Sequence, residues 1–393
     1  MSKSTSGHIK DQQSCNLISS IKKPFYTPAK PLLPLPSNPS PVSVQSFTIY
    51  SGLSLESGEY LTEPTIAYHT YGDPAKPVVW VCHALTANSE VFDWWAGLFG
   101  PTNPFNPQDY FIVCANVLAS CYGTTGPLSK NPVTGQPYFH AYPRITIRDM
   151  VAAHEALRRH LGIQKIHLLL GGSLGGQQAL EWAIQQPRLI DHLALIATNA
   201  RHSAWGIAFN EAQRMSIEAD GTWPQSQPLA GDAGMRAARA TALLSYRNYG
   251  TYGQSQTDSE PTLEQFRAST YQQYQGEKLS RRFNAFSYYR LAQAMDTHHV
   301  GRGRENIEAA LASISARTLV VAISSDVLFP AAEQQYLARH IPHARYLEID
   351  SDYGHDGFLI ETQQLGAALT AFLAETAGQL AHRQLAGLAN QPA

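Results

Sequence analysis

The sequence has few cysteines, little net charge and no long apolar run. Its four cysteines, Cys15, Cys82, Cys114 and Cys121, show neither C-x-x-C spacing nor a disulfide framework, which favours a reducing compartment. The 29 basic and 31 acidic residues leave a net charge of −2, so no basic excess supports a nucleic-acid partner. No apolar run reaches the roughly 18 residues that a membrane span needs. These absences predict a cytoplasmic protein that binds neither nucleic acid nor a membrane.

The two ends of the chain predict segments outside the folded core. Seven prolines lie between Pro24 and Pro41, and proline-rich chain of this kind tends to stay extended and unpacked. The first residues lack both the apolar centre of a signal peptide and the arginines of a transit peptide. We therefore expect residues 1–43 to be a disordered tail and residues 377–393 a C-terminal extension.

From about residue 44 the sequence alternates strand and helix signals. β-forming runs at 42–50 and 65–69 predict an antiparallel opening. Short apolar runs of the kind found in parallel strands buried on both faces follow at 78–82, 110–115, 166–170, 193–197, 319–323 and 346–349. Helical segments separate them, such as 149–161, which Gly162 ends. This alternation predicts the α/β class, with a mostly parallel sheet covered by helices on both faces.

The region between about residues 205 and 300 carries no strand signal. It is rich in Ala, Gln, Arg and Tyr, and it shows helical periodicity at 235–246 and 283–295. An insertion of this length between two strands of one sheet is typical of a cap over the active-site edge. We therefore expect residues 205–300 to form a helical cap on a core made of residues 44–204 and 301–376.

A candidate nucleophile lies in the segment Gly171-Gly-Ser-Leu-Gly175. The apolar run 166–170 precedes it, and a segment able to form a helix, 177–186, follows it. Gly-x-Ser-x-Gly between a strand and a helix is the nucleophile elbow, in which small neighbours let the backbone turn sharply beneath an exposed serine. A glycine-rich turn with an incidental serine is the alternative, and the flanking elements favour Ser173 as the nucleophile.

A serine nucleophile needs a histidine base and an acid that orients it. His355 follows the last predicted strand in a short turn, where a loop can bring an imidazole over the elbow. Asp326 directly follows the strand 319–323, at the carboxyl edge where such sheets place functional groups. The rival acids are too close to His355 in the chain to orient it well: Asp350, Asp352 and Asp356. The predicted catalytic set is therefore Ser173, Asp326 and His355.

An oxyanion hole requires two backbone N–H groups aimed at the developing negative oxygen. One comes from the residue after the nucleophile, Leu174. The other is expected from the turn after the strand 78–82, where Leu85 is the predicted donor. Each such donor typically stabilises the transition state by about 3 kcal/mol.

Several separate segments together resemble the homoserine O-acetyltransferases, which are α/β-hydrolase-fold enzymes of methionine biosynthesis. The matching segments are 82–86, 92–95, 116–127, 131–135, 147–150, 171–182, 209–214, 239–247 and 325–330. They occur in order and span about residues 44 to 375. A single Gly-x-Ser-x-Gly is weak evidence, whereas this ordered set is specific. In that family alanine is unusual at two positions, Ala87 and Ala119, where glycine is common.

The resemblance implies a ping-pong acetyl transfer from acetyl-CoA to the γ-hydroxyl of L-homoserine through Ser173. It also implies that Arg239 binds the substrate carboxylate, Tyr246 hydrogen-bonds nearby and Asp356 binds the α-ammonium. These roles agree with the chemistry, because a guanidinium suits a carboxylate and an acid suits an ammonium. Arg239 and Tyr246 are seven positions apart, about two helical turns, so both face the same way. By the same resemblance we expect a homodimer without a metal or a permanently bound cofactor.

Three other functions remain open at this level. A homoserine O-succinyltransferase or a serine O-acyltransferase would share all the catalytic machinery. An esterase would use water in place of the amino-acid alcohol. A non-catalytic binding protein is disfavoured by the complete set of Ser173, Asp326 and His355.

Overall fold

The computed structural model describes residues 43–375. The predicted tail at 1–43, apart from its last residue, and the predicted extension at 377–393 lie outside this range. No helix in the described range is long and apolar enough to cross a membrane.

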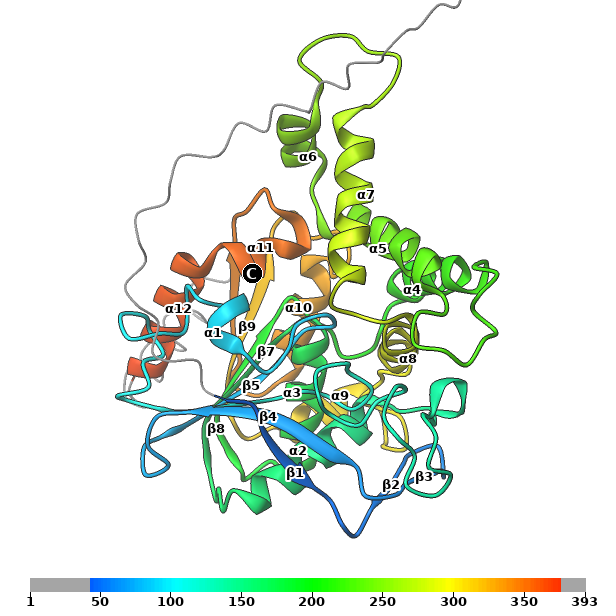
Figure 1. Ribbon diagram of the computed structural model, residues 1–393. Helices are drawn as coiled ribbons and strands as arrows, with labels where there is room; N and C mark the ends of the chain where they lie inside the picture. The colour runs from blue at the N-terminus through cyan, green and yellow to red at the C-terminus, as the bar shows by residue number, and fades with distance from the viewer. Residues whose placement is uncertain (1–42, 376–393) are drawn as a thin grey trace, which may run out of the picture. The chain divides into compact units, whose positions relative to one another are not determined.

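The described chain is built around an eight-stranded sheet (Figure 1). Its strands, in spatial order, are β1 (Gln45–Thr48), β4 (Thr65–Tyr71), β6 (Phe111–Ala115), β5 (Val78–Cys82), β7 (Ile166–Gly172), β8 (Ile190–Ile196), β9 (Arg317–Ile323) and β10 (Arg345–Ile349). Strands β5 to β10 pair in parallel, whereas β1 and β4 are antiparallel to their neighbours. A hairpin of β2 (Leu53–Ser54) and β3 (Tyr60–Leu61) stands apart from this sheet. The mostly parallel sheet and its antiparallel opening are confirmed.

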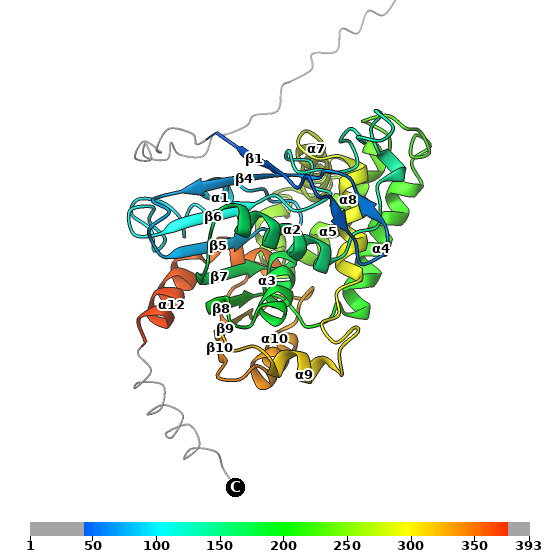
Figure 2. The same ribbon diagram turned by 90° about the horizontal axis from the view of Figure 1, so that it is seen from below.

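Both faces of the sheet are buried, because alternate residues of each central strand enter different cores. In β5, Trp80 and Cys82 pack into the core that includes α2 (Ile147–His160) and α3 (Leu174–Gln185). Val79 and Val81 pack into the opposite core with α1 (Val91–Trp94) and α12 (Thr362–Ala374). Figure 2 shows α12 and the pair α2 and α3 on opposite sides of the sheet. This arrangement explains why the central strands are continuous apolar runs.

Local signals in the sequence set the ends of the helices that flank the nucleophile. Helix α2 begins after Thr146, which forms a capping box with Asp149, and Gly162 follows it with a φ of +70°. Helix α3 begins at Leu174 rather than at the predicted Gln177. The sequence pattern places the start too late because Gly175 and Gly176, which form the first turn, are poor helix formers.

The turn between β7 and α3 leaves no room for side chains on its glycines. Ser173 has φ 57° and ψ −124°, a backbone conformation rare for a residue with a side chain. A Cβ on Gly171 would lie 2.3 Å from the Gly175 carbonyl carbon, and one on Gly175 would lie 2.0 Å from the carbonyl oxygen of Cys82. The glycines of the motif therefore permit the contact between α3 and the end of β5.

Five helices fill residues 204–296, between β8 and α9 (Ile307–Ala312), where the sequence predicts a cap (Figure 1). They are α4 (Ala204–Glu218), α5 (Asp232–Tyr246), α6 (Tyr249–Gln256), α7 (Arg267–Ser280) and α8 (Ala285–Asp296). Helix α6 lies in a polar stretch that contains Gly250 and Gly253. The remaining helical segments are η1 (Phe139–Ala141), α9 (Ile307–Ala312), α10 (Ala331–His340), η2 (Gly354–Asp356) and α11 (Gly357–Ile360).

Helix α5 packs on the turn η2 at one glycine. Gly354 has a φ of +62°, and a Cβ there would lie 2.9 Å from the carbonyl oxygen of Tyr246. This close approach joins the end of α5 to the turn that carries His355.

The two unusual alanines differ in their backbone conformation. Ala119 has a φ of 67°, in the left-handed region that glycine adopts without strain. Ala87 is absent from the described residues with a positive φ, and its N–H donates to the Ala84 carbonyl in an ordinary turn. Glycine is thus conformationally favoured at position 119 and not at position 87.

We expect Gly175→Ala to destabilise the protein severely, because its methyl group would meet backbone that cannot rotate away. Thermal and urea unfolding should show a loss of about 3 kcal/mol or more, or no folded protein. Gly221→Ala is the matched control, since a Cβ there meets nothing within 4 Å and its φ is not positive. Equal stability of the two variants would contradict the packing described for the turn.

Candidate active site

Ser173 lies at the carboxyl end of β7, in the wall of a cavity of about 530 Å³. Its N–H donates to the Ile196 carbonyl at 3.0 Å, and its carbonyl accepts the Thr198 hydroxyl at 2.9 Å. These two bonds, from the last residue of β8 and from Thr198 just after it, hold the strained residue in place. The side chain is therefore presented on a fixed backbone.

His355 and Asp326 come together as the sequence predicts. The carboxylate of Asp326 lies 2.7 Å from Nδ1 of His355. Its other oxygen accepts the N–H groups of Leu328 and Phe329 at 2.8 and 2.9 Å. The rival Asp350 instead accepts the hydroxyl of Ser324 at 3.0 Å. Asp326 is thus a buried, hydrogen-bonded carboxylate that can orient the imidazole.

The surroundings of His355 raise its pKa above the ordinary value of 6.5. Burial acts to lower this pKa, but the negative charge and hydrogen bond of Asp326 outweigh it, and Asp356 adds to the rise. Because Asp326 occupies Nδ1, the other ring nitrogen, Nε2, is left to exchange a proton with a reacting hydroxyl. His355 and Ser173 line the same cavity.

The predicted oxyanion donors, Leu85 and Leu174, are both available. Within residues 43–375 neither N–H donates to a protein acceptor. The N–H of Leu174 is at the first turn of α3, where the helix dipole also favours negative charge. Leu85 lines the cavity beside Ser173. Two buried N–H groups without acceptors are what a developing oxyanion requires.

Arg239 and Tyr246 both extend from α5 into the cavity that contains Ser173. The guanidinium carbon of Arg239 lies 5.3 Å from the centre of the Tyr246 ring. That ring lies 5.7 Å from the imidazole of His355. Burial raises the pKa of Tyr246, although Arg239 acts to lower it, so the phenol stays protonated and can donate a hydrogen bond.

Asp356 also lines the cavity, next in the chain to His355. Its carboxylate lies 3.1 Å from Nε of Arg247. Burial raises the pKa of Asp356 despite the opposing attraction of Arg247, Arg239 and His355. The ion pair with Arg247 was not predicted, although Arg247 directly follows Tyr246 in a segment that the resemblance includes.

Two further basic residues of the cavity were missed, Lys278 and Arg282. The guanidinium of Arg282 donates to the Thr86 carbonyl at 2.5 Å and to the Tyr122 hydroxyl. Arg282 thus joins the segment between α7 and α8 to the loop after β5. No local pattern marks these residues, because their position depends on how the helices pack over the sheet.

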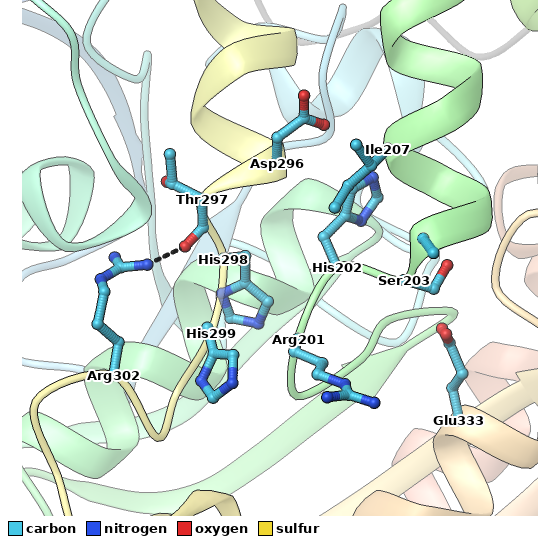
Figure 3. A pocket seen from close by; sticks show the side chains of 11 residues that line it. Arg201, His202, Ser203, Ile207, Asp296, Thr297, His298, His299, Arg302 and Glu333 are labelled. Carbon is cyan, nitrogen blue, oxygen red and sulfur yellow. Dashed lines mark hydrogen bonds between the residues drawn. The ribbon is translucent and has the colours of Figure 1, made fainter.

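A second, larger cavity of about 760 Å³ lies near the start of α4 (Figure 3). Figure 3 shows Arg201 and Glu333 among its side chains. Its serine, Ser203, caps α4 by accepting the Gly206 N–H at 3.1 Å. Burial raises the pKa of Glu333 to about 7, while a hydrogen bond from Asn199 opposes the rise. This cavity contains none of the predicted catalytic residues, so the smaller one is the candidate active site. The described residues include no group of three or more His, Cys, Asp or Glu side chains arranged to hold a metal ion.

Comparison with known sequences supports the same assignment. The profile of the α/β hydrolase fold family matches residues 77–362. The homoserine O-acetyltransferase of Cyclobacterium marinum is 46% identical over 335 residues, covering 84% of this chain and 95% of that protein. The homoserine O-acetyltransferase of Chlorobaculum parvum is 44% identical over 339 residues, covering 84% and 94%.

Solved structures with the same fold include transferases and esterases. The homoserine O-acetyltransferase of Staphylococcus aureus has a TM-score of 0.73 at 28% identity, covering 85% of this chain and 96% of that one. Esterase E22 has a TM-score of 0.77 at 20% identity, covering 84% and 99%, and at that identity the likeness shows the fold alone. The fold therefore does not distinguish acyl transfer from ester hydrolysis.

We expect Asp326→Asn to lower the rate of acyl-enzyme formation by about 10³–10⁴-fold with little change in fold. The rate should rise with pH as His355 loses its proton, with an inflection above the ordinary histidine pKa. In the variant the attraction of Asp326 is lost and burial remains, so the residual rate should inflect at lower pH. Stopped-flow measurement of acylation from pH 5 to 9 gives the rate and its inflection for each enzyme. The same inflection pH in the parent and in Asp326→Asn would contradict this role for Asp326.

Proposed function

The chain belongs to the homoserine O-acetyltransferases of the α/β-hydrolase fold, and we propose that it transfers an acetyl group from acetyl-CoA to the γ-hydroxyl of L-homoserine. The reaction proceeds through an acetyl ester on Ser173 and forms part of methionine biosynthesis. No resident metal or cofactor takes part, and acetyl-CoA is a co-substrate.

One observation carries this proposal beyond the fold. Arg239 and Asp356, which suit the carboxylate and the ammonium of an α-amino acid, line the same cavity as Ser173. An esterase that uses water as acceptor needs neither group. The names of the relatives at 44 to 46% identity support homoserine as the acceptor and acetyl as the transferred group.

The first half-reaction moves the acetyl group to the enzyme. His355 takes the proton of the Ser173 hydroxyl, whose oxygen attacks the thioester carbon. The N–H groups of Leu85 and Leu174 stabilise the negative carbonyl oxygen of the tetrahedral intermediate. The carbon–sulfur bond breaks, CoA leaves as its thiol with the proton from His355, and an acetyl ester remains on Ser173.

The second half-reaction passes the acetyl group to homoserine. Arg239 binds the carboxylate, Tyr246 donates a hydrogen bond beside it, and Asp356 binds the ammonium, which together fix the γ-hydroxyl near the ester. His355, held by Asp326, takes the proton of that hydroxyl as its oxygen attacks the acetyl carbon. The ester bond to Ser173 breaks, and the proton returns to the serine.

We also propose that helices α4 to α8 act as a cap and that the enzyme is a homodimer joined through them. Apolar side chains support this, since Leu244, Tyr249, Phe266 and Tyr274 are 61%, 95%, 44% and 50% exposed on or beside α5, α6 and α7. A second copy of the chain would cover them. Because both substrates are metabolites of the cell interior, we propose a cytoplasmic location.

Release of CoA thiol tests the proposed function directly. With acetyl-CoA as donor, we expect steady release with L-homoserine and at most a single-turnover burst without an acceptor. L-serine should support little release, and succinyl-CoA should be a poor donor. Continuous release that is independent of any amino acid would identify a hydrolase instead.

Measuring the two half-reactions separately distinguishes a substrate-binding role of Arg239 from a structural one. We expect Arg239→Ala to lower kcat/KM for homoserine about 100-fold or more, because a charge-assisted pair to the carboxylate is lost. Acetyl-enzyme formation should stay within about 3-fold of the parent rate. Arg236→Ala is the matched control, since Arg236 lies on the same helix, pairs with Asp232 at 2.6 Å and does not line the cavity. Equal losses in both half-reactions for Arg239→Ala would make it structural.

A further inference from the structure

One buried histidine beside the active site has no role in the reaction described above. His83 follows β5 directly and has no exposed surface. Its ring bonds to two backbone groups and, among residues 43–375, to no side chain: Nδ1 lies 2.8 Å from the Ala84 carbonyl oxygen, and Nε2 accepts the Val117 N–H at 3.0 Å. Val117 follows β6, the neighbour of β5 in the sheet. The imidazole therefore bridges the ends of two adjacent strands.

These two contacts allow only one protonation state of the ring. The backbone N–H of Val117 can donate only to a nitrogen that carries no hydrogen, so Nε2 is bare. The ring proton then lies on Nδ1, which donates to the Ala84 carbonyl. Burial favours this neutral form and lowers the pKa of His83 to about 4, although the hydrogen bond to Ala84 opposes the shift.

The segment that His83 begins is the loop that carries Leu85. The Ala84 carbonyl also accepts the Ala87 N–H at 3.0 Å, which closes a tight turn around Leu85. Because the Leu85 N–H has no protein acceptor in the described chain, no bond of its own fixes its direction. The bonds to the Ala84 carbonyl fix this direction instead, because that carbonyl and the Leu85 N–H belong to the same planar peptide unit.

A second buried contact holds the same loop from α3. Gln178 donates to the His83 carbonyl at 3.2 Å, and its own carbonyl oxygen lies 2.9 Å from Nε2 of His154. Gln178 lies on the helix whose first residue is Leu174. This contact links the two proposed oxyanion donors but does not reach the Ala84 carbonyl, which the His83 ring and the Ala87 N–H hold.

We propose that His83 is a positioning residue that fixes the oxyanion loop, so that the Leu85 N–H points at the carbonyl oxygen of the acyl group on Ser173. The proposal rests on the proposed acyl transfer through Ser173 but not on the identity of donor or acceptor. An oxyanion donor acts only if it is held within about 0.5 Å of its productive position. The His83 ring holds the Leu85 N–H in position through the Ala84 carbonyl and does not itself line the cavity.

The first test replaces the ring while keeping its size. We expect His83→Phe to slow acylation of Ser173 by about 10- to 100-fold, a fraction of what losing an oxyanion donor costs, with KM for homoserine within about 3-fold. His83→Gln, whose side-chain oxygen can accept the Val117 N–H, should recover part of the loss. His192→Phe is the matched control, because Nδ1 of His192 also bonds a backbone carbonyl, at 3.0 Å to His167, but near the other end of the parallel strands.

The assay should use p-nitrophenyl acetate as well as acetyl-CoA. Failure of the wild-type enzyme to acylate with either donor would refute acyl transfer itself. Normal acylation by correctly folded His83→Phe enzyme, counted by active-site titration, would overturn only the role of His83. A phosphonate analogue of the tetrahedral intermediate should bind the variant more weakly in parallel with the lost rate, whereas an effect on packing alone would leave its affinity unchanged.

A spectroscopic test needs no variant to be active. In the wild-type protein with ¹⁵N-labelled histidine, the ring of His83 should carry its proton on Nδ1 and stay neutral from pH 8 to pH 5. The signal is assigned by its absence in His83→Gln. A proton found on Nε2, or titration near the ordinary histidine pKa, would contradict the geometry on which the proposal depends.

Discussion

The close approach of helix α3 to the end of strand β5 is the contact on which the rest of the site depends. Because Gly175 has no side chain, the helix reaches the Cys82 carbonyl, where a Cβ would lie only 2.0 Å away. This contact brings the loop that carries Leu85 next to the first turn of α3. The proposed nucleophile, Ser173, and both proposed oxyanion donors thus come from two strand ends joined by one steric fit. A larger residue at this glycine would separate them.

The charges around the cavity follow from the same geometry. Asp326 is buried but accepts two backbone N–H groups and the imidazole of His355, so its negative charge is compensated without water. The α5 helix adds Arg239 and Tyr246, and Asp356 is paired with Arg247 at 3.1 Å. In the proposed reaction a zwitterionic acceptor satisfies these groups better than water does, which is why we propose acyl transfer rather than hydrolysis.

The sequence predicts the parts of this protein that short-range patterns encode. The parallel sheet follows from continuous apolar runs, and Ser173, Asp326 and His355 follow from residues placed just after strands. Arg239, Tyr246 and Asp356 came from the family resemblance. The structure brings these residues together, and their roles rest on the proposal above.

The missed residues depend on contacts between distant segments. Arg282 reaches Thr86 across 196 positions, and His83 bonds Val117 across 34. No spacing in the sequence reveals such pairs. The start of α3 was misplaced for a different reason, because tertiary packing outweighs the low helix propensity of two glycines.

The central claim is that Ser173 carries the acetyl group between donor and acceptor. Intact-mass spectrometry of the enzyme mixed with acetyl-CoA and no acceptor tests it most directly, with peptide mapping to locate the adduct. The account predicts one acetyl group on the peptide that contains Ser173, its loss within milliseconds to seconds after L-homoserine is added, and no adduct in Ser173→Ala. An acetyl adduct that persists in Ser173→Ala, or one that homoserine does not discharge, would contradict the account.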